Sequence, residues 1–375
     1  MKVPPQSPNL HLGPMSGNVI RATVSFAEKN NWPICLIASR RQIDAQQFGG
    51  GYVNNFSTEK FSESLRDSIT RGHVILARDH GGPYQRIEEK DLPLEAAIKR
   101  TVQSYQTDMR SGFKIIHIDP EKAIERGAPN ALETFTELTK RLLGECFIFL
   151  DKIKKNDVCF EIGSDEGVGM DFTPDHWGNF ITEINQYCAK KGQPNPIAIA
   201  VPLGTKVKED DNIGGLALNI QDPFWVNRVE DMKVIADINN IKLKLHNADY
   251  ISSEVLKRYL DLGAEQINVA PQLGVVETKA LINFLRDNNL RKHADAFLKI
   301  SFESEKWERW LKDDSTANDE QKAIISGHYI FSTNEFDKLY KEVTKEIDSG
   351  RLESVLINEI TKVIDTYYQV FYDRL

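Results

Sequence analysis

Two adjacent residues, Asp79 and His80, carry side chains that could do chemistry, and they directly follow an apolar segment typical of a buried strand. Gly81-Gly82-Pro83 comes next and forces a turn. In barrel enzymes the catalytic side chains lie at the C-terminal ends of the strands. A neutral imidazole there can bind a divalent ion, while a neighbouring carboxylate exchanges protons with a substrate. The alternative interpretation is a glycine-rich turn with a capping Asp.

A second histidine, His246, ends another strand-like stretch and is followed by Asn247-Ala248-Asp249. Two histidines at two strand ends predict one shared metal site. Taken alone, His246 fits equally well as a hydrogen-bonded histidine of the core.

Further acidic and imidazole groups follow two other candidate strands. Glu161 lies at a strand tip, and Glu166 lies in the glycine-punctuated loop after it, where a mobile acid can donate a proton to a substrate. Asp165 in the same loop is expected to be solvated. His117 and Asp119 end the preceding strand, and because alternate residues of a strand share a face, we expect both to line the same cavity.

Glycine-rich segments offer backbone N–H groups that can hold a phosphate or a sugar hydroxyl. One segment contains Gln47, Gly49 and Gly50, and the other contains Gly81. Neither matches a phosphate-loop or dinucleotide fingerprint, so a purely conformational role is the alternative. Asn268-Val269-Ala270-Pro271 closes a further strand, at the position where many barrels bind phosphate.

The elements that must position these residues alternate between short apolar runs and amphipathic stretches. The candidate strands are 34–38, 73–77, 114–118, 158–162, 197–201, 232–236 or 242–245, and 266–269, and the candidate helices are 59–70, 93–110, 131–155, 176–191 and 253–262. This rhythm predicts an α/β fold, a (β/α)8 TIM barrel whose eighth unit is only weakly marked. An open, doubly wound sheet is the alternative.

The 375 residues are long enough for a large barrel with additions. We expect a flexible, proline-containing N-terminal lead over 1–15, the barrel over 16–296, and a helical C-terminal extension over 297–375, where tryptophans and a long amphipathic pattern replace the strand–helix rhythm.

Charge and cysteine usage exclude several classes of protein. The net charge is −8 and the basic residues are scattered, so we expect no nucleic-acid partner. The four cysteines are far apart and lie mostly in apolar surroundings, which predicts reduced, buried thiols and a cytoplasmic protein. No apolar run has transmembrane length, so we expect no membrane insertion.

Together these motifs resemble the class II ketose-bisphosphate aldolase superfamily, and most of all its tagatose-bisphosphate aldolase subunits of the non-catalytic GatZ/KbaZ type. The resemblance covers nearly the whole chain. It rests, in sequence order, on Ile37 to Asp44 with Gln47-Phe48-Gly49-Gly50, Asp79-His80-Gly81-Gly82-Pro83, Gly112 to Asp119, Glu161-Ile162-Gly163-Ser164, and Ile347 to Leu352.

The resemblance implies a site that holds a divalent metal, with zinc the expected ion. In this sequence Asp79 matches the acid that moves the substrate's hydroxyl proton, and His80 and His246 match two metal ligands. Leu203 stands near the place of the third histidine, so Glu161 is the expected substitute. The residues implied in substrate or phosphate binding are Gln47, Gly49, Gly50, Gly81, Asn247, Asp249, Asn268 and Ala270.

Two functions from different classes follow. The first is a metal-dependent lyase that cleaves or forms a C–C bond in a ketose (bis)phosphate. The second is a non-catalytic subunit that stabilises a partner tagatose-bisphosphate aldolase. The expected partners are a sugar phosphate and either a catalytic aldolase subunit or further copies of this chain. A kinase is disfavoured, because the sequence has no P-loop.

Overall fold

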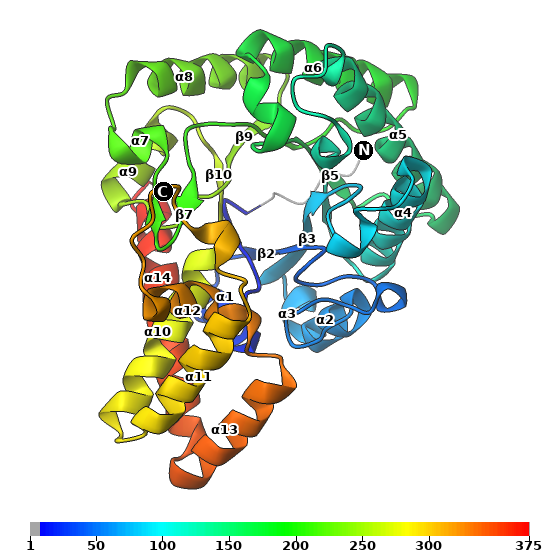
Figure 1. Ribbon diagram of the computed structural model, residues 1–375. Coiled ribbons are helices and arrows are strands. Elements are labelled where there is room, and N and C mark those ends of the chain that lie inside the picture. Colours follow the sequence, from blue (N-terminus) through cyan, green and yellow to red (C-terminus); the bar gives the residue numbers. More distant parts are fainter. Residues whose placement is uncertain (1–7, 375) are drawn as a thin grey trace.

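The computed structural model describes residues 8–374, and its centre is a closed barrel of eight parallel strands (Figure 1). In sheet order the strands are β1 (Leu10–Leu12), β10 (Gln266–Val269), β9 (Lys242–Leu245), β6 (Ala198–Ala200), β5 (Cys159–Gly163), β4 (Ile115–Ile118), β3 (Val74–Gly81) and β2 (Ile34–Ser39). Most of their residues are buried, as expected for strands covered on both faces. The predicted TIM barrel is therefore confirmed, and the open sheet is wrong.

Helices form the outer layer of the barrel, and at least one follows each strand (Figure 1). They are α1 (Gly17–Asn30), α2 (Thr58–Ser64), α3 (Arg66–Thr70), α4 (Leu94–Arg110), α5 (Ala131–Ile153), α6 (Pro174–Lys190), α8 (Pro223–Ile238), α9 (Ser253–Asp261) and α10 (Pro271–Asp287). Between β6 and α8 the chain adds a hairpin of β7 (Val207–Lys208) and β8 (Asp211–Asn212) and the short helix α7 (Gly215–Leu218). Short 3-10 turns lie at η1 (Gln46–Phe48), η2 (Ile87–Glu89), η3 (Glu121–Ala123) and η4 (Gly167–Asp171).

Polar residues set where these helices begin. The Ser16 hydroxyl accepts the Val19 N–H at 3.0 Å at the start of α1. At α6 the Thr173 hydroxyl accepts the His176 N–H, and Pro174 fills the first helical position. Such caps satisfy N–H groups that have no partner within the helix, and they fix the loops that lead from each strand.

The first barrel strand lies in the segment expected to be a flexible lead. Leu10 and Leu12 are fully buried, and β1 pairs with β10 on one side and β2 on the other. The lead is thus wrong for 10–12, while residues 1–7 of that prediction lie outside the described residues. The weakly marked eighth unit is β1, and the alternative strand 232–236 lies inside α8.

The C-terminal helices form a second layer on one side of the barrel (Figure 1). They are α11 (Arg291–Glu303), η5 (Glu308–Trp310), α12 (Asp319–Ser326), η6 (Gly327–Tyr329), α13 (Asn334–Glu346) and α14 (Ser349–Tyr372). The expected boundary at residue 297 lies within α11. Helix α14 joins two cores, because Leu352 and Leu356 pack in the extension while Ile360 and Ile364 pack in the barrel core.

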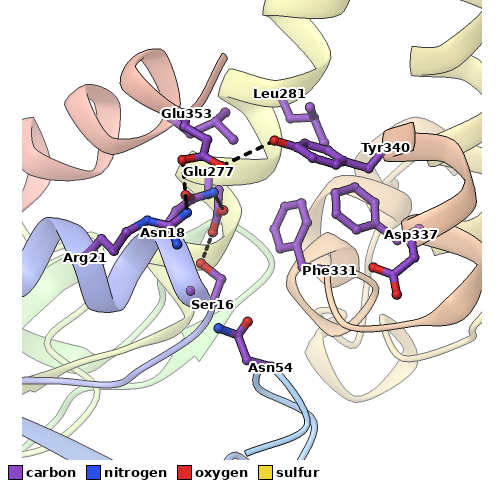
Figure 2. Close-up of a pocket in the computed structure, with 13 residues that line it drawn as sticks. Ser16, Asn18, Arg21, Asn54, Glu277, Leu281, Phe331, Asp337, Tyr340 and Glu353 are labelled. Carbon is purple, nitrogen blue, oxygen red and sulfur yellow. Dashed lines mark hydrogen bonds and ion pairs between the residues drawn. The ribbon is translucent and has the colours of Figure 1, made fainter. Parts of the chain in front are cut away.

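A cavity of about 360 Å³ separates part of the extension from the barrel (Figure 2). Its barrel side carries Ser16, Asn18 and the buried carboxylate of Glu277, and its extension side carries Phe331 and Tyr340. The Asn18 amide donates to Glu277 at 2.6 Å, and the Ser16 hydroxyl donates to the same carboxylate.

In the described part of the chain, no helix combines the length and apolarity needed to cross a bilayer. Cys35, Cys146, Cys159 and Cys188 are all free and buried, as predicted. The cytoplasmic location expected from them stays a prediction.

Candidate functional site

Three histidines converge at the C-terminal end of the barrel. His80 lies on β3, His117 lies on β4, and His246 directly follows β9. The ring centroids are 5.5 Å apart for His80 and His117, 5.0 Å for His80 and His246, and 5.3 Å for His117 and His246. The two histidines predicted to share a site, His80 and His246, therefore lie side by side, and a third imidazole joins them.

An irregularity in β3 lets two neighbouring side chains reach this site. Adjacent residues of a regular strand point to opposite faces. Here the register with β4 shifts between Arg78 and Gly81, and His80 has a left-handed φ of 39°. The Asp79 carboxylate lies 4.0 Å from His117 Nδ1, and the His80 backbone N–H donates to that same nitrogen at 3.3 Å. Bulges and positive φ values of this kind occur preferentially beside functional sites.

Gly81 and Gly82, predicted to contact a substrate, have a packing role in this bend. A Cβ atom at Gly82 would collide with the carbonyl oxygen of Asp119, and one at Gly81 would crowd that of His117. The glycines therefore bring the ends of β3 and β4 close enough for their side chains to meet.

Each of the three imidazoles has one ring nitrogen beside an oxygen acceptor. His80 Nδ1 lies 2.8 Å from Asp119 Oδ2, His246 Nδ1 lies 3.0 Å from Asp165 Oδ1, and His117 Nε2 lies 3.0 Å from Gly163 O. Histidines that bind metals show this arrangement, because the acceptor fixes the tautomer and orients the ring. In His80 and His246 the opposite nitrogen, Nε2, is then the one that can coordinate an ion, whereas Nδ1 of His117 accepts the His80 N–H and would have to give up that hydrogen bond to bind an ion.

The residues present fit a divalent metal. His246 Nε2 is buried and has no hydrogen-bond partner in the described structure. A buried polar atom of this kind is unfavourable unless a bound ligand or ion interacts with it. Tetrahedral zinc with Zn–N distances of about 2.0–2.1 Å places the ring centroids of two ligating histidines about 5.2 Å apart. The three observed separations bracket that value. Ligand atoms of Asp79, His117 and His246 lie within 4.8 Å of one another, as do those of His80, Asp165 and His246.

The electrostatics of the site favour an ionised Asp79. Burial alone would raise the pKa of Asp79, but the charges of His80, His246 and His117 hold that pKa well below its usual range. Burial lowers the pKa of His80, yet the charges of Asp79 and Asp119 raise that pKa well above its usual value. Without metal, His80 therefore keeps a proton that a cation must displace on binding.

Asp165 holds His246 in place and is the residue that sequence reasoning missed. Its side chain is 6% exposed, and its second oxygen accepts from the Asn247 amide at 2.7 Å. The pKa of Asp165 is lowered to about 2, because the charge of His246 outweighs the effect of burial. The expectation of a solvated Asp165 is wrong. Asp165 lies two residues beyond the end of β5, and this position near a strand end is the feature of the sequence that could have indicated its role.

Glu161, the expected third ligand, is engaged elsewhere. Its Oε2 lies 2.6 Å from Lys244 Nζ, and both side chains are 0% exposed. Lys244 Nζ also lies 3.0 Å from His11 Nδ1. Burial would raise the pKa of Glu161, but the charge of Lys244 lowers it. Glu161 belongs to neither group of candidate ligands. His246 is common to both groups, His117 belongs to one and His80 to the other, so these three imidazoles are the proposed set.

The residues predicted to bind substrate or phosphate divide into two sets. Asn268 reaches the site, where its amide donates to Asp79 Oδ1 at 3.3 Å. Gln47 and Gly49 are exposed, and the N–H groups of Gly49 and Gly50 donate within their own turn.

Three other predicted contacts already have partners within the chain. Asn247 holds Asp165, and Asp249 accepts the Ala270 N–H at 2.9 Å. Glu166 is exposed at the start of η4, outside the cluster of histidines.

Comparison with solved structures shows which proteins share this fold. A probable tagatose 6 phosphate kinase from Sinorhizobium meliloti matches with a TM-score of 0.75 and 16% identity, over 96% of this chain and 100% of that chain. Fructose-bisphosphate aldolase from Campylobacter jejuni matches with a TM-score of 0.56 and 14% identity, over 97% and 90%. Fructuronate-tagaturonate epimerase UxaE from Cohnella laeviribosi matches with a TM-score of 0.55 and 13% identity, over 97% and 82%.

No protein-family model matches the sequence, and no curated protein matches it. The fold expected from the resemblance to class II aldolases is confirmed by the solved structures. At these identities the likeness establishes the shared (β/α)8 barrel alone.

Proposed function

We propose that this protein is a metal-dependent lyase of the class II aldolase type, which cleaves or forms a C–C bond in a ketose. The observation that carries the proposal is the unpartnered, buried Nε2 of His246 among three converging imidazoles. His80, His117 and His246 would hold the divalent ion, with zinc the expected metal. A bound ion would polarise the ketose carbonyl and stabilise the negative charge that develops there in the transition state.

Asp79 is the proposed proton-transfer group. Its lowered pKa keeps it ionised, and the Asn268 amide at 3.3 Å orients one of its oxygens. In cleavage, Asp79 accepts the proton of the hydroxyl on the carbon β to the carbonyl. That oxygen then becomes an aldehyde as the C–C bond breaks, and the electron pair passes to the ketone half. Glu166, on an exposed loop beside the site, is the proposed donor of the proton that completes the ketone product.

A second candidate is the non-catalytic subunit, which would stabilise a catalytic aldolase partner or assemble with copies of itself. The observation that favours it is Leu203, a buried apolar side chain near the position where the resembled catalytic enzymes have a metal-binding histidine. The converging His117 supports the enzyme instead, because it supplies a third imidazole from a different strand.

Metal analysis of the purified protein separates the two candidates. After expression with ample zinc, we expect about one ion per chain in the wild type and a clear loss in His246→Ala. His176→Ala is the matched control, because His176 is an exposed histidine on α6. Asp79→Ala should keep its metal and lose at least about 100-fold in C–C cleavage.

Three results would contradict the lyase. Wild-type protein that binds no metal would contradict it. Equal metal content in His246→Ala and the wild type would contradict it too. Cleavage that persists with a strong chelator would also do so, and it would point to a Schiff-base lysine. Metal binding without any turnover by the isolated chain would support the subunit candidate.

A further inference from the structure

We infer that the substrate carries a hydroxyl group rather than a phosphate at the end that faces β9 and β10, and that Asp249 sets this preference. The inference rests on the proposed function. In many barrels a substrate phosphate binds to the loops after the seventh and eighth strands, at the N-terminus of a helix, where free N–H groups and the helix dipole attract an anion. Here those strands are β9 and β10, and the helix that follows is α10.

The carboxylate of Asp249 already occupies that helix terminus. Its Oδ1 accepts the N–H groups of Ala270 and Gln272, both at 2.9 Å. Pro271 has no N–H, and the Leu273 N–H donates to the Ala270 carbonyl at 3.1 Å. These first donors of the helix are therefore used by groups of the chain itself, and a phosphate would find none of them free.

The loop that carries Asp249 is fixed from several sides. The Asn212 amide donates to the carbonyl oxygens of Asn247 and Asp249 at 2.8 and 2.9 Å. Tyr367 of α14 donates to the Ala248 carbonyl at 2.8 Å. Asp249 itself is 1% exposed. A phosphate could bind here only by displacing the buried Asp249 side chain, because both N–H groups already donate to its Oδ1.

Asn268, beside Asp79 at the end of β10, keeps an acceptor without a partner. Its amide nitrogen donates to Asp79, so its Oδ1 is turned to a different side, where it is buried without a hydrogen-bond partner in the described structure. An unsatisfied buried oxygen of this kind is unfavourable until a donor reaches it. A substrate hydroxyl would donate to it, whereas phosphate oxygens at neutral pH are mainly acceptors and would be repelled.

The experiment compares two ligands by calorimetry with the zinc-loaded protein: a three-carbon hydroxyketone and its phosphate ester. We expect the hydroxyketone to bind the wild type at least tenfold more tightly than the ester. Asp249→Gly should improve binding of the ester at least tenfold, because it vacates the helix terminus. Asp249→Ser keeps a capping oxygen without the charge and should shift the preference in the same direction, which serves if the glycine variant does not fold. Asp348→Ser, which makes the same change at the exposed cap of α14, is the matched control and should leave the preference unchanged.

The outcomes separate the inference from the proposed function. Tighter binding of the phosphate ester to the wild type would overturn the inference and leave the lyase standing. An unchanged preference in folded Asp249→Gly and Asp249→Ser would remove Asp249 as its cause. If the zinc-loaded wild type binds neither ligand, or holds no zinc, the proposed function fails and the inference fails with it.

Discussion

Replacing Lys244 with Met should destabilise the barrel by about 3–5 kcal/mol, because it leaves the buried Glu161 carboxylate without its cation. Both side chains are 0% exposed and their charged atoms are 2.6 Å apart, so solvent contributes little screening. For a chain of 375 residues this corresponds to a fall in melting temperature of about 4–6 °C.

The pH dependence of this loss has a definite sign. In the wild type Lys244 lowers the pKa of Glu161, so the pair contributes stability above the usual value of 4.5 and loses it as the pH falls. In Lys244→Met the largest opposing charge is lost and only His11 and His117 oppose the effect of burial, so the pKa of Glu161 should rise. The variant then binds a proton that the unfolded chain does not, so its deficit should be smaller at pH 5 than at pH 8.

Urea unfolding of the metal-free proteins, followed by circular dichroism, measures the effect. Lys206→Met is the control, because Lys206 is exposed and should change stability by less than about 0.5 kcal/mol. The double variant Lys244→Met with Glu161→Leu should recover most of the loss, since no charge stays buried. A deficit below about 1 kcal/mol would refute the reasoning. The reasoning would also be refuted if Glu161→Gln had normal stability but lost its metal, because Glu161 would then be a metal ligand.

Three further variants test the site and its supports. Asp119→Asn should weaken zinc binding about 10–100-fold in equilibrium dialysis, because Asp119 orients His80, and an unchanged affinity would exclude that role. Tyr367→Phe removes a hydroxyl that lies within hydrogen-bonding distance of two oxygens of the barrel, the Ala248 carbonyl and Gln272 Oε1, and should cost about 1–2 kcal/mol in denaturant titrations; an unmoved midpoint would contradict this. Burial raises the pKa of Glu277 to about 7, so the wild type should lose stability as pH rises from 4.5 to about 7. Melting temperatures measured across this pH range should fall for the wild type but not for Glu277→Gln. The same fall in both proteins would argue against this role of Glu277.

The barrel could be predicted because its strands are buried on both faces and several therefore appear as apolar runs, such as Ile34–Ser39 and Ala198–Ala200. The exception is β1, whose three residues Leu10–Leu12 include a buried histidine and follow several prolines. A strand that short has no periodicity to detect. Its identity follows only from closure of the barrel, which needs a partner between β10 and β2.

Within the candidate site, the sequence indicated the residues that immediately end a strand, including Asp79, His80 and His117. It could not indicate which acids would pair with which bases. Glu161 seemed free to bind a metal because its cation, Lys244, lies 83 residues away in the sequence. Asp165 seemed solvated because the turn that brings it to His246 depends on contacts between two loops.

Helix α14 connects the C-terminal extension to the loop that carries Asp249. Tyr367 comes from the half of α14 that packs in the barrel core, and its hydroxyl bonds the residue next to Asp249. Asn212, on the hairpin after β6, holds the other side of that loop. Contacts between the extension and this hairpin, such as the ion pair of Lys312 with Asp211 at 3.0 Å, connect both supports. The added helices therefore stabilise the loop whose carboxylate fills the helix terminus, the contact on which the inferred preference for a hydroxyl over a phosphate depends.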